Sequence, residues 1–247
     1  MSLLFGLVAD WSAMECCVLG EMSLVVTYHR QNNVVEICMD QKSRDHFYQG
    51  WLYHFLVDPL LRRVHRLVRS QVKPGSTLID IGCGTGELLF SLADVGSELV
   101  GVETSKRMWS FADRQARARG FNNVQILFGD GAKLENFSAG SFDYAIACMV
   151  LHEMDVSQRL PVLKEMQRLA PNLILVDYRV PPPANLAAAM CRFIERLAGR
   201  RHFRNYASFI NNGGLLPLYE TFSLSVQREI TFYSRCLHLG LSSPDIS

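Results

Sequence analysis

Short apolar runs alternate with helical periodicity over most of the chain. The runs at 77–80, 98–103, 124–128, 142–147 and 172–177 are rich in aliphatic residues, as buried strands are. Between them, apolar residues recur at three- and four-residue steps, for example Leu88, Leu89 and Leu92. Strands that alternate with helices form parallel sheets covered on both faces. The pattern therefore predicts a doubly wound α/β domain.

The segments that flank this pattern predict further elements. Residues 43–73 carry a helical repeat interrupted by Pro59, which indicates two helices. Residues 185–212 predict a helical insertion with a stripe of arginines and an apolar side that includes Leu186 and Phe193. The runs at 222–233 and 235–241 predict two closing strands. In the extension 1–42, two β-type runs flank 31–33 and predict either a hairpin or a loosely held segment, to which we assign no function.

A glycine-rich turn follows the first of these strands. It reads Asp80-x-Gly82-x-Gly84-x-Gly86, and a helical pattern starts at Leu88. Such a turn presents backbone N–H groups and the positive end of a helix to a ligand. The spacing differs from the G-x-G-x-x-G of dinucleotide sites, and the acid favours a cationic group over a phosphate. A glycine turn without a ligand is the other interpretation.

At this motif the chain resembles the class I S-adenosylmethionine-dependent methyltransferases, and the resemblance covers residues 43–241. It looks closest to the small-molecule group (methyltransferase types 11 and 25) with a Val-Leu-His segment after the fourth strand, here residues 150–152. That group includes enzymes that methylate quinone precursors and lipids. The resemblance implies a Rossmann-like seven-stranded sheet with an antiparallel last strand, in a methyltransferase domain over 43–247. It further implies a helical cap over 43–73, S-adenosylmethionine as the methyl donor and S-adenosylhomocysteine as the product.

Two acids beyond the glycine turn fit a nucleoside ligand. Glu103 ends the second strand 21 residues after Gly82, where a carboxylate can bind ribose hydroxyls, as in NAD sites also. Asp130 follows the third strand, where the resemblance implies an acceptor for the adenine amino group, although an ordinary turn is the alternative. The predicted cofactor-binding residues are Asp80, Gly82, Cys83, Gly84, Gly86, Glu103, Thr104, Asp130, Gly131 and Cys148.

The sequence defines the site for the methyl acceptor less clearly than the cofactor site. In doubly wound sheets ligands lie where the strand order reverses, so residues 147–153 are expected to face the methyl group. The sequence after the fourth strand lacks the Asn/Asp-Pro-Pro-aromatic tetrad of enzymes that methylate nucleobase amines. His152 is the candidate general base or, alternatively, a packing histidine. The candidate substrate-binding residues are Tyr48, Trp51, Tyr178 and Arg179, each with core packing or loop exposure as its alternative.

The net charge, the cysteines and the hydropathy of the chain bear on its partners and its cellular compartment. The net charge is +1, from 25 basic and 24 acidic residues, which argues against a dedicated nucleic-acid surface. The seven cysteines form no C-x-x-C pair and predict reduced thiols in a cytoplasmic protein without a metal site. The first residues lack the basic region of a signal peptide, so we expect none, and no apolar run reaches the ~18 residues that a membrane span needs. The arginine stripe fits contact with an acidic substrate or an anionic membrane surface, and a solvated helix face is the alternative.

These observations predict a methyltransferase that acts on a small molecule by in-line displacement. One alternative is an NAD(P)-dependent oxidoreductase, which the glycine spacing opposes. Another is an aminopropyl transferase, whose glycine motif and acid pair are not found here. A third is a non-catalytic binding module with the same fold, which would be favoured if side chains closed the region around Cys148 and His152.

Overall fold

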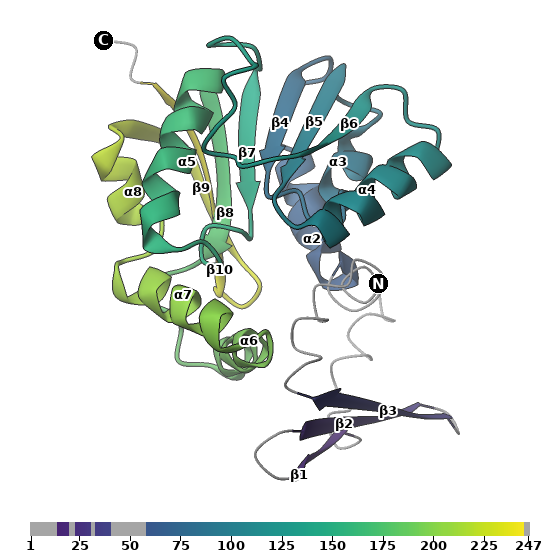
Figure 1. Ribbon diagram of the computed structural model, residues 1–247. Coiled ribbons are helices and arrows are strands. Elements are labelled where there is room, and N and C mark those ends of the chain that lie inside the picture. Colours follow the sequence, from purple (N-terminus) through teal and green to yellow (C-terminus); the bar gives the residue numbers. More distant parts are fainter. Residues whose placement is uncertain (1–13, 20–22, 31–32, 41–57, 245–247) are drawn as a thin grey trace. The chain divides into compact units, whose positions relative to one another are not determined.

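Two units make up the chain, Met1–Phe47 and Tyr48–Ser247. The computed structural model describes residues 14–19, 23–30, 33–40 and 58–244. In the first unit, β1 (Met14–Leu19), β2 (Ser23–Arg30) and β3 (Asn33–Asp40) form an antiparallel sheet in that order (Figure 1). Strands β2 and β3 pair Arg30 with Asn33, as in the hairpin that was one of the two interpretations of this extension, and β1 pairs with β2 before it.

Seven strands form the sheet of the second unit, in the order β6-β5-β4-β7-β8-β10-β9 (Figure 1). Their bounds are β4 (Thr77–Ile81), β5 (Glu98–Glu103), β6 (Val124–Phe128), β7 (Tyr144–Cys148), β8 (Asn172–Tyr178), β9 (Leu224–Phe232) and β10 (Leu237–Pro244). The first five are parallel, and β10 is antiparallel to both of its neighbours, β8 and β9. The predicted doubly wound sheet with an inserted antiparallel strand is confirmed.

The sheet is wound outward in two directions from its centre. The chain runs from β4 to β6 through α3 (Glu87–Leu92) and α4 (Lys106–Ala118), and then returns to β7 beside β4. From there α5 (Val156–Leu169) leads to β8 on the other side. Because crossovers between parallel strands are right-handed, this reversal places α5 on the opposite face from α3 and α4. The reversal between β4 and β7 is where such sheets bind ligands.

The core is centred on the strands next to this reversal. Leu78 and Ile79 of β4 and Ala145 and Ile146 of β7 are completely buried, as a strand covered on both faces requires. Helix α4 begins after Ser105, whose hydroxyl accepts a hydrogen bond from the Met108 N–H at 3.4 Å. The apolar runs at β4, β5, β7 and β8 are therefore buried strands, whereas β6, at the edge of the sheet, buries only Ile126.

The structure gives the bounds of the flanking helices. Helix α2 (Asp58–Arg69) has Pro59 in its first turn, where proline is tolerated, so Pro59 begins this helix. The rest of the predicted cap, 43–57, lies outside the described residues. The insertion 185–212 contains two helices, α6 (Leu186–Leu197) and α7 (Arg200–Asn211), separated at Gly199 with φ 116°. Helix α8 (Leu216–Thr221) was not predicted.

Helices α6 and α7 lie beyond the carboxyl ends of β7 and β8 (Figure 1). The face of α6 that is buried carries Ala188 and Glu195. Leu186 and Phe193, which the pattern placed on the apolar side, are 77% and 41% exposed. This part of the prediction was wrong because the helix packs against polar groups at the end of the sheet. Among the described residues, none of the helices has the length and apolar character that crossing a membrane requires.

Candidate cofactor site and an adjoining histidine cluster

The glycine turn after β4 is closely packed on one side and open on the other. Gly82, Gly84 and Gly86 have φ values of 73°, 56° and 81°, which side chains rarely adopt. A Cβ atom on Gly82 would lie 2.4 Å from Cγ2 of Val150, in the loop after β7. A Cβ atom on Gly84 would meet nothing closer than the Met108 methyl carbon at 3.7 Å. The turn therefore leaves space for a ligand above Gly84.

Glu103 brings the end of β5 to this turn. Its Oε2 accepts a hydrogen bond from the Gly84 N–H at 3.0 Å, and its Oε1 accepts one from the Ser105 N–H at 2.7 Å. Burial raises the pKa of Glu103, and the hydrogen bonds from Ser105, Gly84 and Thr104 oppose that rise. The side chain of Thr104 itself is exposed. The carboxylate predicted for a ribose thus lies at the glycine turn, held in place by backbone N–H groups.

Asp80 has a buried oxygen that lacks a partner. The residue is 2% exposed, and its Oδ1 has no hydrogen-bond partner in the part of the chain that the structure describes. The pKa of Asp80 is raised to about 7, mainly because the carboxyl group is buried and to a smaller extent because Glu103 is negatively charged. A buried acceptor without a partner is costly unless a ligand supplies one. A cationic ligand group fits this oxygen, because it would also stabilise the ionised carboxyl group.

The loops after β6 and β7 reach the same edge of the sheet. A Cβ atom on Gly131 would lie 2.4 Å from Ile81 Cγ2, so the loop after β6 packs against the end of β4. Its neighbour Asp130 accepts a hydrogen bond from the Ala132 N–H at 3.0 Å, as a turn-forming aspartate does. Cys148 ends β7 and is half-buried. The predicted cofactor-binding residues therefore lie in neighbouring loops.

Not every predicted residue in these loops faces a free space. Cys83 is buried, and its Sγ lies 2.7 Å from where a Cβ on Gly101 of β5 would be. The side chain thus packs on the sheet, and its backbone N–H donates to the Val102 carbonyl oxygen at 3.2 Å. Tyr48 and Trp51 lie outside the described residues. The remaining donors and acceptors fit a nucleoside that carries a cationic group, as the glycine spacing indicates.

A second cluster begins at His152, four residues after the end of β7. Asp177 of β8 accepts hydrogen bonds from the His152 backbone N–H at 3.1 Å and from the Tyr178 N–H at 2.7 Å. Its Oδ1 also lies 2.8 Å from His152 Nδ1. His152 and Asp177 are 2% and 0% exposed. The contact with Asp177 fixes the orientation of the His152 imidazole, so that its Nε2 atom points toward α6 and α7.

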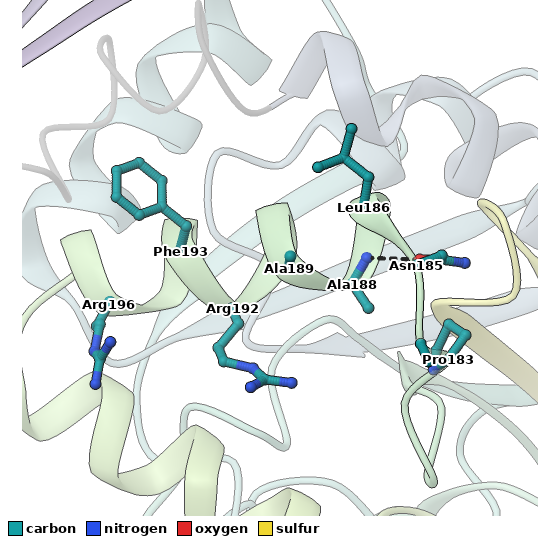
Figure 2. Close-up of a pocket in the computed structure, with 9 residues that line it drawn as sticks. Pro183, Asn185, Leu186, Ala188, Ala189, Arg192, Phe193 and Arg196 are labelled. Carbon is teal, nitrogen blue, oxygen red and sulfur yellow. Dashed lines mark hydrogen bonds between the residues drawn. The ribbon is translucent and has the colours of Figure 1, made fainter.

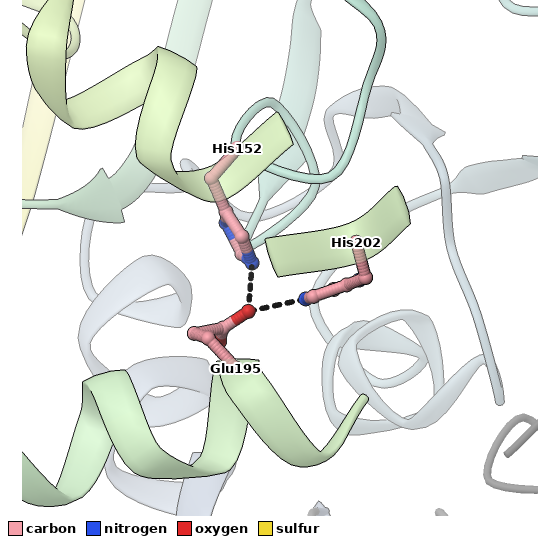
Figure 3. Close-up of side chains that lie close together, drawn as sticks. All are labelled: His152, Glu195 and His202. Atoms are coloured by element: carbon pink, nitrogen blue, oxygen red, sulfur yellow. Dashed lines mark hydrogen bonds and ion pairs between the residues drawn. The ribbon is translucent and has the colours of Figure 1, made fainter. Parts of the chain in front are cut away.

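Glu195 of α6 and His202 of α7 complete this cluster (Figure 3). His152 Nε2 lies 3.6 Å from Glu195 Oε2, which is also in direct contact with His202 Nε2. The Tyr178 hydroxyl donates to the other oxygen, Glu195 Oε1, at 2.6 Å. Burial lowers the pKa of His152, but the charges of Asp177, Glu195 and Glu153 outweigh it and raise the pKa to about 10.

We define the histidine cluster as His152, Asp177, Tyr178, Glu195 and His202. Three of these residues, Asp177, Glu195 and His202, were not predicted from the sequence. The sequence did contain one sign that Glu195 is buried. Glu195 lies seven residues after Ala188, so the two residues share one face of the helix, and a small apolar residue on that face indicates close packing. Nothing in the local sequence singled out Asp177 or His202. Arg179, a predicted substrate contact, is half-buried, and its backbone N–H donates to the Cys236 carbonyl oxygen at 2.8 Å.

A shallow groove of about 650 Å³ follows the outer side of α6 (Figure 2). It is lined by Pro183, Asn185, Leu186, Ala188, Ala189, Arg192, Phe193 and Arg196, among others. The side chain of Asn185 caps the helix by accepting from the Ala188 N–H at 2.9 Å. The groove contains none of the predicted cofactor-binding residues, and its arginines belong to the stripe seen in the sequence.

Comparisons with known proteins agree with this geometry. A family model described as a methyltransferase domain matches residues 78–172. A demethylmenaquinone methyltransferase of Geobacillus stearothermophilus is 31% identical over 150 residues, which are 57% of this chain and 63% of that protein. A nocamycin O-methyltransferase of Saccharothrix syringae is 38% identical over 94 residues, 37% of this chain and 32% of that protein. The chain therefore spans less than two thirds of the length of these relatives.

The fold has counterparts among solved structures. A SAM-dependent methyltransferase from Aquifex aeolicus superposes with a TM-score of 0.56 at 17% identity, covering 83% of this chain and 98% of that one. At this identity the likeness shows the fold. The matched segment, 78–172, contains the glycine turn and Glu103, and it runs to the start of β8. Residues 78–172 therefore form a methyltransferase domain of the class I S-adenosylmethionine-dependent type.

Proposed function

We propose that this domain transfers a methyl group from S-adenosylmethionine to a small-molecule acceptor. The observation that carries the proposal is the pairing of Glu103 with the glycine turn beside the unpartnered oxygen of Asp80. When bound, the donor supplies a methyl group on a positively charged sulfur. The protein's contribution to such a displacement is to hold the two reactants in line and to exclude water, which supplies several kcal/mol.

Each residue of the turn has a role in this proposal. Glu103 accepts hydrogen bonds from the ribose hydroxyls, and Asp80 neutralises the ammonium group of the methionine part. Asp130 accepts from the adenine amino group with the oxygen that does not hold the turn. The glycines allow the ligand to approach the backbone. None of these contacts involves the acceptor, so the cofactor site works independently of the identity of the acceptor.

The acceptor that we propose is a hydroxylated, quinol-like or lipid-like small molecule. The support is that several relatives are named demethylmenaquinone methyltransferases and one is named an O-methyltransferase. The sequence after β7, Cys148-Met149-Val150, also lacks the tetrad of enzymes that methylate nucleobase amines. Tyr178 and Arg179 remain proposed acceptor contacts at the end of β8.

The role of His152 as general base remains a prediction, and its surroundings do not favour it. With a pKa raised to about 10, the imidazole is protonated near neutral pH and has no lone pair available for a proton. Its Nε2 is directed at Glu195. An acceptor that loses its proton easily, such as a phenol, would not need this base.

A binding module without catalysis is the second candidate. Its support is that side chains close the surroundings of His152, which is 2% exposed. Turnover distinguishes the two candidates. We expect mass spectrometry to detect S-adenosylhomocysteine and a methylated product when the protein, S-adenosylmethionine and a panel of quinols, catechols, thiols and fatty-acid derivatives are combined. Cofactor binding without turnover of any acceptor would support the module.

The affinity for S-adenosylmethionine is expected to rise between about pH 6 and about pH 8. Asp80 has its pKa raised to about 7 in the free protein, so binding of an ammonium group at lower pH must first release the proton of the carboxyl group. The limiting slope is about tenfold in affinity per pH unit below the pKa. Calorimetry at several pH values tests this. Asp80→Asn should bind weakly at every pH, and an equally steep profile in that variant would contradict the assignment.

A further inference from the structure

The histidine cluster contains a set of donors that the proposed methyl transfer does not use. His152 comes from the loop after β7, Glu195 from α6 and His202 from the first turn of α7. Figure 3 shows the three side chains pointing toward one another from these separate segments. We infer that His152, Glu195 and His202 bind a divalent transition-metal ion.

The distances fit a metal ion. His152 Nε2, His202 Nε2 and a carboxylate oxygen of Glu195 all lie within 4.8 Å of one another. Neighbouring ligand atoms about 2.0–2.2 Å from a metal are about 2.8–3.1 Å apart in octahedral geometry and about 3.3–3.6 Å apart in tetrahedral geometry. The separation of 3.6 Å between His152 Nε2 and Glu195 Oε2 already meets this condition. His202 Nε2 is in contact with Glu195 Oε2, which is too close for two ligands of one ion. The His202 side chain must therefore move away from Glu195 Oε2 when a metal ion binds.

Outer hydrogen bonds prepare each donor atom. Asp177 Oδ1 lies 2.8 Å from His152 Nδ1, and a proton on Nδ1 leaves the lone pair of Nε2 for the metal. The Tyr178 hydroxyl occupies Glu195 Oε1 at 2.6 Å and leaves Oε2 for the metal. A carboxylate behind a histidine ligand is the usual outer shell of a metal site, because it orients the ring and strengthens the ligand.

The charges around these donors favour a cation. Asp177 and Glu195 are 0% and 5% exposed, and Oε1 of Glu153 lies 3.9 Å from His152 Nε2. Arg159, buried close by, donates to the carbonyl oxygens of Leu151 and Asn205 instead. A dication would take the place of the proton on His152 Nε2, which is released to solvent, and would compensate the two buried carboxylates with both imidazoles neutral. The competing arrangement is a metal-free network in which protonated imidazoles provide the compensation.

The donor set selects the class of ion. Two imidazole nitrogens and one carboxylate suit Zn²⁺, Fe²⁺, Co²⁺ or Ni²⁺, whereas Mg²⁺ and Ca²⁺ prefer oxygen alone. Three protein ligands leave at least one position for water or for an oxygen of a bound molecule. The sequence predicted no metal site, because its cysteines form no C-x-x-C pair. This site uses histidines 50 residues apart and an acid between them.

Metal titration of the full chain tests the inference. The protein is stripped with a chelator, dialysed and titrated with Co²⁺ and Zn²⁺, using calorimetry and the visible spectrum of Co²⁺. We expect one ion per chain and at least tenfold weaker binding in Glu195→Gln and in His202→Gln. Tyr178→Phe, which removes only the outer hydrogen bond, should weaken binding about tenfold. His65→Gln is the matched control, because His65 is a buried histidine of α2.

Several outcomes would overturn the inference. One is a wild-type protein that takes up no Co²⁺ or Zn²⁺, which would establish the metal-free network. Another is retention of wild-type affinity in His202→Gln and Tyr178→Phe, which decide the matter even if Glu195→Gln does not fold. A Co²⁺ spectrum with strong thiolate bands would place the ion on cysteines instead. The titration is done without S-adenosylmethionine, so it is independent of the proposed methyl transfer.

Discussion

Glu103→Ala is expected to weaken the binding of S-adenosylmethionine at least tenfold, or about 1.4 kcal/mol. The carboxylate lies at the glycine turn, where Gly84 and Ser105 hold both of its oxygens. Hydrogen bonds to a charged group are worth about 1.5–3 kcal/mol each, so the loss of two ribose contacts weakens binding more than about a hundredfold if both contribute in full. Calorimetry with the methyl donor and with S-adenosylhomocysteine measures the effect, which should be similar for both because both carry the ribose.

Two variants control this experiment. Glu98→Ala removes the same side chain from the opposite, exposed end of β5 and should bind like the wild type. Glu103→Gln keeps one neutral acceptor oxygen and should fall between the wild type and Glu103→Ala. If Glu103→Ala binds with wild-type affinity while its circular dichroism spectrum is unchanged, the ribose contact is wrongly assigned.

Asp177→Ala is expected to lower the free energy of unfolding by about 3–5 kcal/mol, as the removal of one partner from a buried ion pair does. The carboxylate is fully buried and lies against the backbone N–H of His152, the His152 imidazole and the backbone N–H of Tyr178. The substitution leaves all of these groups without their acceptor. Urea denaturation followed by circular dichroism measures the loss.

The matched control for this prediction is Asp113→Ala on the surface of α4. Asp113 pairs with Arg117 one turn later at 3.1 Å, and exposed pairs of this kind contribute less than about 1 kcal/mol. Asp177→Asn should still be destabilised, because its NH₂ group must face one of the N–H donors. A midpoint shift for Asp177→Ala as small as that for Asp113→Ala would mean that the histidine cluster does not stabilise the fold.

The sequence determined the sheet and the position of the cofactor site. Buried parallel strands are nearly continuous apolar runs, and a turn that needs three positive φ angles requires glycines, so both features are local and can be read from the order of residues. The position of Glu103 followed from the length of one βαβ unit. Local patterns therefore predicted which residues lie at the carboxyl edge of the sheet.

The tertiary structure decided the electrostatics of the site and the histidine cluster. The unpartnered oxygen of Asp80 depends on what surrounds β4, and the state of His152 depends on Asp177 and Glu195, which are 25 and 43 residues away. Burial and charge partners across such separations arise only when β8, α6 and α7 meet at the end of the sheet. The local sequence pattern does not predict this contact between β8, α6 and α7. Asp177, Glu195 and His202 are each largely shielded from solvent only because the other two segments cover them.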